Sequence, residues 1–358
     1  MTTVKVIAAR ELTAEQIGIW IRLQEADPAV DSPYFRPEFT QAVAAVRDDI
    51  EVAILEQDGR PVGFFPFQRG LWNSGQPLGG RLSDFHGVIA APDADWSGKE
   101  LIRDCGLASW TFDHLVAAQT PFADCHWNVA ESHYIDLSEG FESYETARRA
   151  AGSKELVKLR RKFRKLEREV GPLRFELHTD GHEALETLLR WKSAQYLRTG
   201  LTDVFGFDWT VKLLEQLMTR THPDFAGCLS VLYVGDRLAA VHFGMRSRHV
   251  LHYWFPAYDT DFTRYSPGLI LLAEIAKAAA EDGIHRIDLG KGLEQFKMTM
   301  SSGAIPVAEG AVECSPMNRL LRQNWYRTRE WLRESPLRSP ALATARLIRP
   351  FREWLAFH

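Results

Sequence analysis

The sequence predicts an α/β protein that contains two copies of one domain. Two observations carry this prediction. A strand, two helices and two more strands follow one another in the same order twice, at a spacing of about half the chain. In both copies the last two strands are joined by a tight polar turn, at Asp58-Gly59 and at Gly235-Asp236, as in β-hairpins. We therefore expect a duplicated domain rather than a solenoid.

The elements of the two copies are read from apolar periodicity and turn residues. In the first copy we expect a strand over 4–8, helices over 14–26 and 37–47, a hairpin over 51–68 and a further helix over 97–105. In the second copy the matching elements are a strand over 173–178, helices over 182–196 and 208–220, and a hairpin over 229–246. The two copies differ after their hairpins, where only the second has a clearly punctuated helix.

That helix of the second copy has signals at both ends. A strand over 250–257 precedes it, and a strand over 286–289 follows it. Ser266 stands at the predicted N-cap, Pro267 at the first helical position and Gly283 at the C′ position. The main-chain N–H groups at a helix start bind phosphate well. We therefore expect the ligand site mainly in the second copy.

Composition excludes several classes of protein. The chain of 358 residues has a formal net charge of -4, which argues against DNA binding by bulk charge. The cysteines Cys105, Cys125, Cys228 and Cys314 are far apart, which argues against a zinc site or disulfide framework and fits a reducing cytoplasm. There is no export signal and no apolar run of about 18 residues. We expect a cytoplasmic protein without a metal.

Two segments have a basic, amphipathic character. Between residues 148 and 168, ten residues are basic and two are acidic, and Leu156, Leu159, Phe163 and Leu166 recur at helical spacing. This pattern predicts one basic helix, either a solvated linker or a surface for phosphate, an acidic polymer or RNA. The tail over 316–358 is either a docking helix or a contact with a membrane surface or a partner synthase. The predicted domains are therefore 1–145, a linking helix over 146–170, 171–315, and the tail.

The second half also carries a family pattern. It consists of Tyr253 and Tyr258, Tyr265-Ser266-Pro267-Gly268 at a helix start, Gly283 at its end, 287–292 (Ile-Asp-Leu-Gly-Lys-Gly) and Phe296-Lys297. Further marks are 32–35, 83–85, 192–196 and 199–200. The pattern resembles the GNAT superfamily, and more closely the tandem CelD-like acyltransferases of polysaccharide biosynthesis, which are relatives of the Fem peptidyltransferases. The resemblance implies two tandem GNAT-like domains, each a mixed, mostly antiparallel sheet flanked by helices, the first degenerate.

GNAT proteins transfer an acyl group directly from a thioester, usually acetyl-CoA, to an amine or hydroxyl. The resemblance places the donor at three sets of residues. Phe255, Pro256 and Ala257 border the thioester carbonyl, and Lys297 binds donor phosphate or pairs with Asp288. The pyrophosphate loop is Arg264, Tyr265, Ser266, Pro267 and Gly268. This loop has one glycine where the usual GNAT loop has more, and Fem-type proteins with altered loops use aminoacyl-tRNA, so both acyl-CoA and tRNA stay open as donors.

The catalytic candidates are an aspartate, a tyrosine and two histidines. Asp288 either orients the substrate or acts as base, and otherwise forms a structural ion pair near 290–292. His242 and His252 either accept a proton from the nucleophile or are packed strand residues. Tyr258 is the candidate proton donor to the thiolate, against a role in the core.

The acceptor candidates come from both copies. Lys192, Gln195, Tyr196 and Asp203 lie where GNAT proteins shape the acceptor site. In the first copy, Asp84 and His86 either face an inter-domain groove or, for Asp84, cap a turn. We expect an acetyltransferase that acts on a small-molecule or saccharide acceptor of polysaccharide or envelope synthesis. The alternatives are a Fem-like transferase that uses aminoacyl-tRNA, and an inactive scaffold for a synthase.

Overall fold

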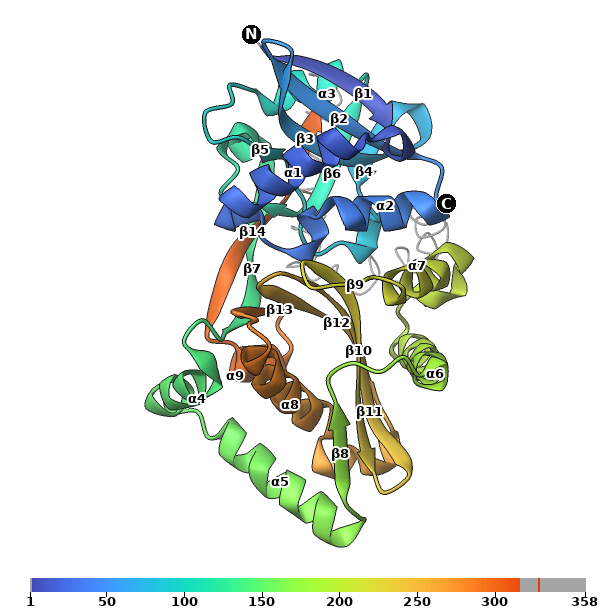
Figure 1. The fold of residues 1–358 in the computed structure, drawn as a ribbon, viewed down its shortest axis with the longest axis vertical. Coiled ribbons are helices and arrows are strands. Elements are labelled where there is room, and N and C mark those ends of the chain that lie inside the picture. The colour runs from blue at the N-terminus through green and yellow to red at the C-terminus, as the bar shows by residue number, and fades with distance from the viewer. Residues whose placement is uncertain (1, 316–327, 329–358) are drawn as a thin grey trace. The chain divides into compact units, whose positions relative to one another are not determined.

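The computed structural model describes residues 2–315 and residue 328 and divides the chain into two compact units (Figure 1). Among the described residues, the first unit contains 2–30, 43–130 and 306–315, and the second contains 31–42 and 131–305. These boundaries differ from the predicted division at 145 and 171, because residues 31–42 belong with the second half of the chain and residues 306–315 with the first. The predicted tail over 316–358 lies outside the described residues, apart from residue 328.

The first unit contains a mixed sheet with the strand order β1-β2-β3-β4-β6-β14, and β5 pairs with β3. The pairs are antiparallel except β4 with β6. Its elements are β1 (Thr3–Ala8), α1 (Ala14–Ala26), α2 (Pro37–Val46, shared with the second unit), β2 (Ile50–Gln57), β3 (Arg60–Arg69), β4 (Ser74–Pro77), β5 (Ile89–Ala90), α3 (Gly98–Asp104), β6 (Ser109–Val116) and β14 (Gly303–Glu313, shared). Its core is rich in aromatic side chains, among them Phe65, Phe67, Trp110 and Phe122.

The second unit contains a sheet with the order β7-β13-β12-β11-β10-β8, and β9 pairs with β10. All of these pairs are antiparallel except β12 with β13. Its strands are β7 (His126–Asp136, shared with the first unit), β8 (Leu173–Glu176), β9 (Thr221–His222), β10 (Phe225–Val234), β11 (Arg237–Ser247), β12 (Val250–Tyr258) and β13 (Arg286–Lys291). The predicted mixed α/β fold is thereby confirmed.

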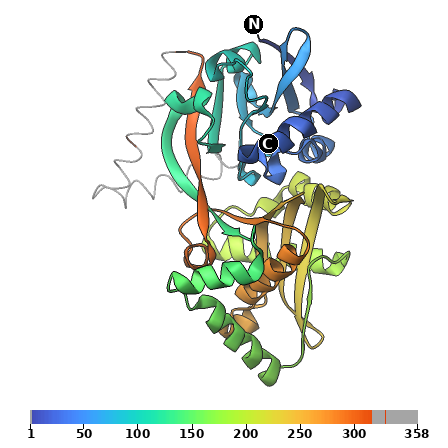
Figure 2. The same cartoon turned by 60° about the vertical axis from the view of Figure 1, so that its left-hand side comes forward.

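Helices cover both faces of the second sheet. Figure 1 shows α6 and α7 on one face and α8 on the other. Figure 2 shows α4 and α5 on the same side as α8, against which both pack. The helices of this unit are α4 (Gly140–Ala150), α5 (Glu155–Glu169), α6 (His182–Thr199), α7 (Asp208–Met218), α8 (Pro267–Glu281) and α9 (Gln295–Met300). In the part of the chain that the structure describes, no helix is long and apolar enough to cross a membrane.

The basic segment forms two helices rather than the single predicted helix. Helix α4 ends at Ala150, and α5 begins at Glu155. Between them Gly152 has a φ of +82°, which a helix interior does not allow, so the chain turns there. The amphipathic pattern of α5 is confirmed, because Leu156, Leu159 and Leu166 are buried in the core of the second unit.

Candidate active site

The strands β12 and β13 pair over a short stretch and then separate. Their parallel register covers only Val250–His252 of β12 and Arg286–Asp288 of β13. Beyond this point β12 continues to Tyr258 with its other edge on β11, while β13 follows β7. The β13-facing edge of the remaining β12 residues has no register partner among the described residues. These residues include Phe255, Pro256 and Ala257, where the resemblance places the thioester. Pro256 has no N–H and its carbonyl accepts from Lys192, so any main-chain bond to a substrate comes from its neighbours on this edge.

The start of α8 has fewer available main-chain N–H groups than the sequence suggested. Ser266 is left-handed, with a φ of +57°, and its side chain does not cap the helix. Its carbonyl accepts from the N–H groups of Leu269 and Ile270, both at 3.1 Å, and Pro267 has no N–H to offer. Tyr265 and Pro267 are buried. The expectation that several main-chain N–H groups at this helix start are available to bind phosphate is therefore wrong. Gly268 carries the one other N–H of the first turn.

Cationic side chains surround the same helix start. Lys162 of α5 donates to Ser266 Oγ at 2.6 Å. The Arg264 guanidinium lies 4.6 Å from the centre of the Tyr265 ring and is 67% exposed, and Lys165 Nζ lies 6.0 Å from the same ring centre. Tyr265 also donates to Glu169 at 2.8 Å, and this bond lowers the pKa of Glu169. Positive charge at this loop thus comes mainly from side chains. The sequence pattern identified a basic helix but not Lys162 as a loop contact, because the contact joins residues far apart in the chain.

Lys192 connects the predicted acceptor and donor residues. Its ammonium group donates to the Pro256 carbonyl and to Gln195 Oε1, both at 3.2 Å, and lies 5.4 Å from the centre of the Tyr196 ring. Burial and then the charge of Lys297 lower the pKa of Lys192 to about 8. A lysine with this pKa is partly neutral near physiological pH, so it can bind as a cation or accept a proton.

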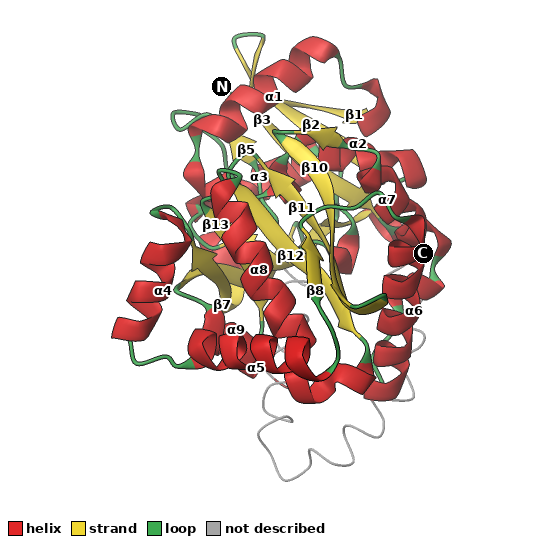
Figure 3. Ribbon diagram, turned by 60° about the horizontal axis from the view of Figure 1, so that its bottom comes forward, coloured by secondary structure: helices red, strands yellow, loops and turns green. Residues whose placement is uncertain are grey.

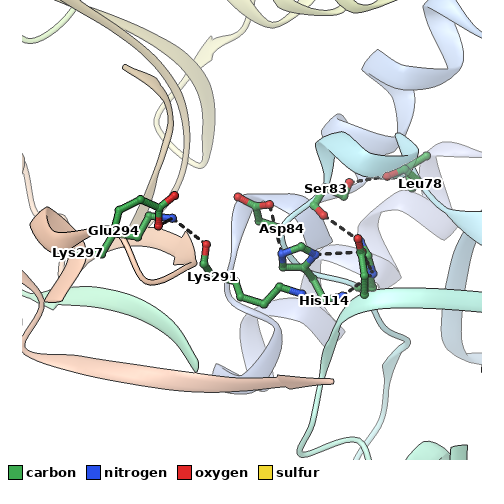
Figure 4. Close-up of polar contacts among 9 residues, drawn as sticks. Leu78, Ser83, Asp84, His114, Lys291, Glu294 and Lys297 are labelled. Atoms are coloured by element: carbon green, nitrogen blue, oxygen red, sulfur yellow. Dashed lines mark hydrogen bonds and ion pairs between the residues drawn. The ribbon is translucent and has the colours of Figure 1, made fainter. Parts of the chain in front are cut away.

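Lys297 lies near Lys192 and is held by the loop before it. Its ammonium group donates to the Lys291 carbonyl at 2.8 Å and lies 3.3 Å from Glu294 Oε2 (Figure 4). Its side chain is 11% exposed. Lys297 therefore pairs with Glu294 and the 291–294 turn rather than with Asp288, and it adds positive charge beside Lys192.

Asp203 and the loop that follows position the aromatic side of this site. Asp203 accepts from Phe205 N and from Ser193 Oγ, both at 3.1 Å. The Phe205 ring lies 5.0 Å from the Phe255 ring and 6.2 Å from the Tyr196 ring, centre to centre. Asp203 thus holds the loop whose phenylalanine packs against the donor strand.

Asp288 lies in a buried ion pair. Its side chain is 1% exposed and accepts from Arg286 Nε at 2.8 Å. Arg286 also donates to Asp31 at 2.9 Å, and burial raises the pKa of Asp31. The sequence did not suggest this pairing, because Asp31 comes from the first half of the chain. The geometry favours a structural role for Asp288 over that of a base.

The two strand histidines lie inside the second unit. His242 and His252 are fully buried. The His242 ring stacks on Tyr253 with ring centres 4.2 Å apart, and burial holds the pKa of His242 well below 6.5. The His252 ring packs against Tyr34 at 4.9 Å. The expectation that they face a cleft is not met, because both side chains point into the packed core.

Tyr258 lies beside the start of α8. Its side chain is 42% exposed. A Cβ atom placed on Gly268 would lie 3.4 Å from Tyr258 Cδ1, so the phenol ring lies beside the start of α8. The structure therefore brings Tyr258 and Gly268 together, at the end of the donor strand.

Asp84 and His86 belong to the first unit and form a separate cluster there. His86 is buried, its Nε2 lies 3.0 Å from the Ser83 carbonyl, and burial lowers its pKa to about 4. Asp84 Oδ1 lies 3.7 Å from His114 Nε2 (Figure 4). The contacts of His86 with Ser83 and of Asp84 with His114 therefore lie within the first unit.

Known proteins resemble this chain in part of its sequence and in its fold. Residues 153–298 match the family model described as an acetyltransferase (GNAT) domain. No curated protein matches the chain. The chain is similar in structure to FemX, with a TM-score of 0.55 and 10% identity over 88% of this chain and 99% of that one. It is also similar to the C-terminal domain of an Agrobacterium fabrum protein described as a lysylphosphatidylglycerol synthetase, with a TM-score of 0.53 and 15% identity over 86% and 94% of the two chains. L-PGS from Bacillus licheniformis gives a TM-score of 0.51 and 13% identity over 87% and 96%.

The fold and the domain match define the class of protein. At such low identity the structural likenesses show the fold, and the match to an acetyltransferase domain supports an acyltransferase. The chain carries a GNAT acetyltransferase domain in its second half and is a GNAT-type acyltransferase. The finer assignment to CelD-like proteins stays a prediction.

Proposed function

We propose that the protein transfers an acetyl or other acyl group from coenzyme A to an amine or hydroxyl of a saccharide precursor, in a cytoplasmic step of polysaccharide or envelope synthesis. One observation supports the position of the transfer site. The Lys192 amine contacts the Pro256 carbonyl, where β12 no longer pairs with β13. This position is next to the strand on which a GNAT thioester lies. The saccharide acceptor rests on the resemblance to CelD-like proteins.

The proposed reaction needs few groups. The acceptor nitrogen or oxygen attacks the thioester carbon, the new C–N or C–O bond forms, and the C–S bond breaks. A main-chain N–H of the free β12 edge other than Pro256, which has none, stabilises the carbonyl oxygen as negative charge develops. Lys192 in its neutral form takes the proton of the nucleophile, and the Tyr258 phenol gives a proton to the departing thiolate. Lys162, Arg264 and the Gly268 N–H hold donor phosphate.

This proposal is tested by following coenzyme A release from acetyl-CoA with a panel of amino sugars, in the wild type, Lys192→Met and Lys212→Met. Lys212 is an exposed lysine on the neighbouring helix α7 and serves as the control. We expect Lys192→Met to reduce kcat at least 100-fold with little change in acetyl-CoA affinity, as for loss of a general base. Turnover that is unchanged in Lys192→Met removes Lys192 from the mechanism.

A second donor, aminoacyl-tRNA, is favoured by one observation. The basic helix α5 contacts the predicted donor loop through Lys162 and Ser266. Its Arg161 and Arg164, and Lys154 just before it, are exposed and form no ion pair among the described residues. Binding of acetyl-CoA and of aminoacyl-tRNA measured across a salt series discriminates the donors, because tRNA binding falls steeply with salt. Saturable acetyl-CoA binding without tRNA binding supports the preferred donor.

A further inference from the structure

The first unit holds a group of histidine and aspartate side chains that the acyl transfer does not use. Asp113 and His114 are consecutive residues of β6, so their side chains would normally point to opposite faces of the sheet. The register between β6 and β14 shifts here: Leu115 pairs with Ala308, Phe112 pairs with Gly310, and the two residues between them oppose Glu309 alone. This is a β-bulge, which re-aims side chains at such positions. It lets Asp113 and His114 reach the same point.

Three ligand atoms converge at this bulge. His114 Nδ1 lies 3.0 Å from Asp113 Oδ1, and His86 Nδ1 lies 3.8 Å from the same oxygen. Ligand atoms of His86, Asp113 and His114 all lie within 4.8 Å of one another. Two ligands of one tetrahedral zinc ion are about 3.3 Å apart, given bonds of about 2.0 Å. The observed spacings bracket this separation, so a small shift admits one ion.

The ring nitrogens of His86 have partners that fix its tautomer, and His114 Nδ1 forms a hydrogen bond with Asp113 Oδ1 at 3.0 Å that an ion would replace. His86 Nε2 lies 3.0 Å from the Ser83 carbonyl and donates to it, while His86 Nδ1 accepts a long bond of 3.3 Å from the His114 N–H. The lone pair of His86 is thus on Nδ1. His114 Nε2 lies 3.7 Å from Asp84 Oδ1 (Figure 4). Metal-binding histidines typically have such a carbonyl or carboxylate at the far nitrogen.

Backbone bonds hold His86 beside β6. The His86 N–H donates to the His114 carbonyl at 2.9 Å, and the Val116 N–H donates to the His86 carbonyl at 3.1 Å. The two imidazole rings are nearly perpendicular, at 79°, with centres 5.7 Å apart. The loop that carries Asp84 and His86 is therefore fixed against the bulge before any ligand arrives.

We propose that His86 Nδ1, His114 Nδ1 and Asp113 Oδ1 bind a divalent transition-metal ion, with Asp84 and the Ser83 carbonyl as positioning groups. Two imidazoles and one carboxylate suit zinc, cobalt or iron(II), whereas magnesium and calcium prefer oxygen ligands. Three protein ligands leave at least one coordination position open. The spacing of the cysteines gave no sign of this site, because its ligands are not cysteines and His86 is distant in sequence from the other two.

The test uses the untagged full chain, stripped with a chelator and titrated with Co²⁺ while its visible absorption is recorded, followed by competition with Zn²⁺. We expect one Co²⁺ per chain, absorption of the intensity typical of four- or five-coordinate cobalt, and complete displacement by one equivalent of Zn²⁺. Stoichiometry is confirmed by elemental analysis after gel filtration. An absorption spectrum that stays that of aqueous Co²⁺ at millimolar concentration overturns the proposal.

Matched variants locate the ion. Asp113→Asn alters a side chain that is 45% exposed, so the fold is retained, and we expect binding at least tenfold weaker; His114→Gln should abolish it. Asp84→Asn, which changes a positioning group, should weaken binding about tenfold. His222→Ala is the control, since His222 is 73% exposed and also lies beside an aspartate, Asp224. Equal binding by wild type and Asp113→Asn, or an equal loss in His222→Ala, contradicts the site.

Discussion

Individual residues of the second unit owe their properties to neighbours that are distant in the chain. Asp288 lies in the predicted strand β13, yet its partner Arg286 is shared with Asp31. Lys192 is an ordinary helix lysine in the sequence, and its lowered pKa comes from burial and from Lys297. A sequence pattern identifies the residue type and its element. It does not identify the charges that meet it after folding.

For Asp288, the buried pair with Arg286 predicts a loss of stability on substitution. We expect Asp288→Asn to lower the free energy of unfolding by about 2 kcal/mol, because a charged hydrogen bond is lost in the core. The control is Asp282→Asn, which breaks a pair with Arg246 in which the aspartate is 54% exposed and should cost less than about 1 kcal/mol. Both are measured by urea unfolding. A stable Asp288→Asn protein with lost turnover would instead support Asp288 as a base.

For Lys192, the shifted pKa predicts a pH dependence of stability. Its pKa is about 8 in the folded protein and about 10.4 when unfolded. Between these values the unfolded chain binds more protons, so stability rises as pH rises from 8 to about 10.4, and is lower below 8. The largest possible change in the free energy of unfolding over this pH range is about 3 kcal/mol. Lys192→Met should remove this rise from urea-unfolding curves, while Lys212→Met should keep it.

At the scale of elements, the helices and hairpins were predictable and their mutual contacts were not. Figure 3 shows α5 running close to α8. The apolar spacing in α5 and the proline at the start of α8 are visible in the sequence. The contact of Lys162 with Ser266 arises only when the two helices pack. Because of this contact, the positive charge at the donor loop comes from side chains and not mainly from main-chain amides.

The contact between α5 and α8 predicts that α5 takes part in donor binding. We expect Lys162→Glu to weaken acetyl-CoA binding at least tenfold, because it replaces a cation at the loop by an anion. Arg161→Glu changes the charge equally, but one residue away and about 100° around the helix, so it should have a smaller effect. Isothermal titration calorimetry at low salt measures both. Equal losses would indicate a general charge effect of α5.

The start of α8 itself gives a further prediction. Gly268→Glu adds a carboxylate beside Tyr258, where a Cβ atom has ordinary van der Waals room at 3.4 Å. We therefore expect a folded protein that has lost donor binding, because like charges repel at the phosphate site. Circular dichroism checks the fold, and calorimetry with acetyl-CoA checks binding. Wild-type affinity in this variant would exclude the loop from the site.

At the scale of the whole molecule, both compact units are built from separated parts of the chain. Residues 31–42 supply Tyr34, which packs at 4.9 Å on His252 of the second unit. Strand β7 supplies the neighbour of β13. The repeated order of elements indicated two units, but it did not indicate that segments are exchanged between the halves of the chain.

The exchange of segments predicts the behaviour of fragments. A fragment of residues 171–315, the domain that the sequence suggested, lacks 31–42, β7 and α5, and so leaves the core of the second unit open. We expect it to unfold without cooperativity and to bind no acyl-CoA, whereas the full chain should unfold cooperatively and bind acyl-CoA. Thermal melting followed by near-ultraviolet circular dichroism measures this. A cooperative transition in the fragment would show that the exchanged segments are dispensable.

The sequence by itself determined the mixed α/β fold, the two hairpins and the punctuated helix α8, because periodicity and turn residues act over short stretches of chain. The GNAT-type chemistry was implied by the resemblance of its motifs to that superfamily. Only the tertiary structure decided that His242 and His252 are buried and that Asp288 is paired. It also decided that Lys192 contacts Pro256, that Lys162 contacts Ser266 and that His86 lies beside Asp113 and His114. Burial and charge at these positions depend on residues brought together from distant segments. Such proximity follows from packing and has no local signal.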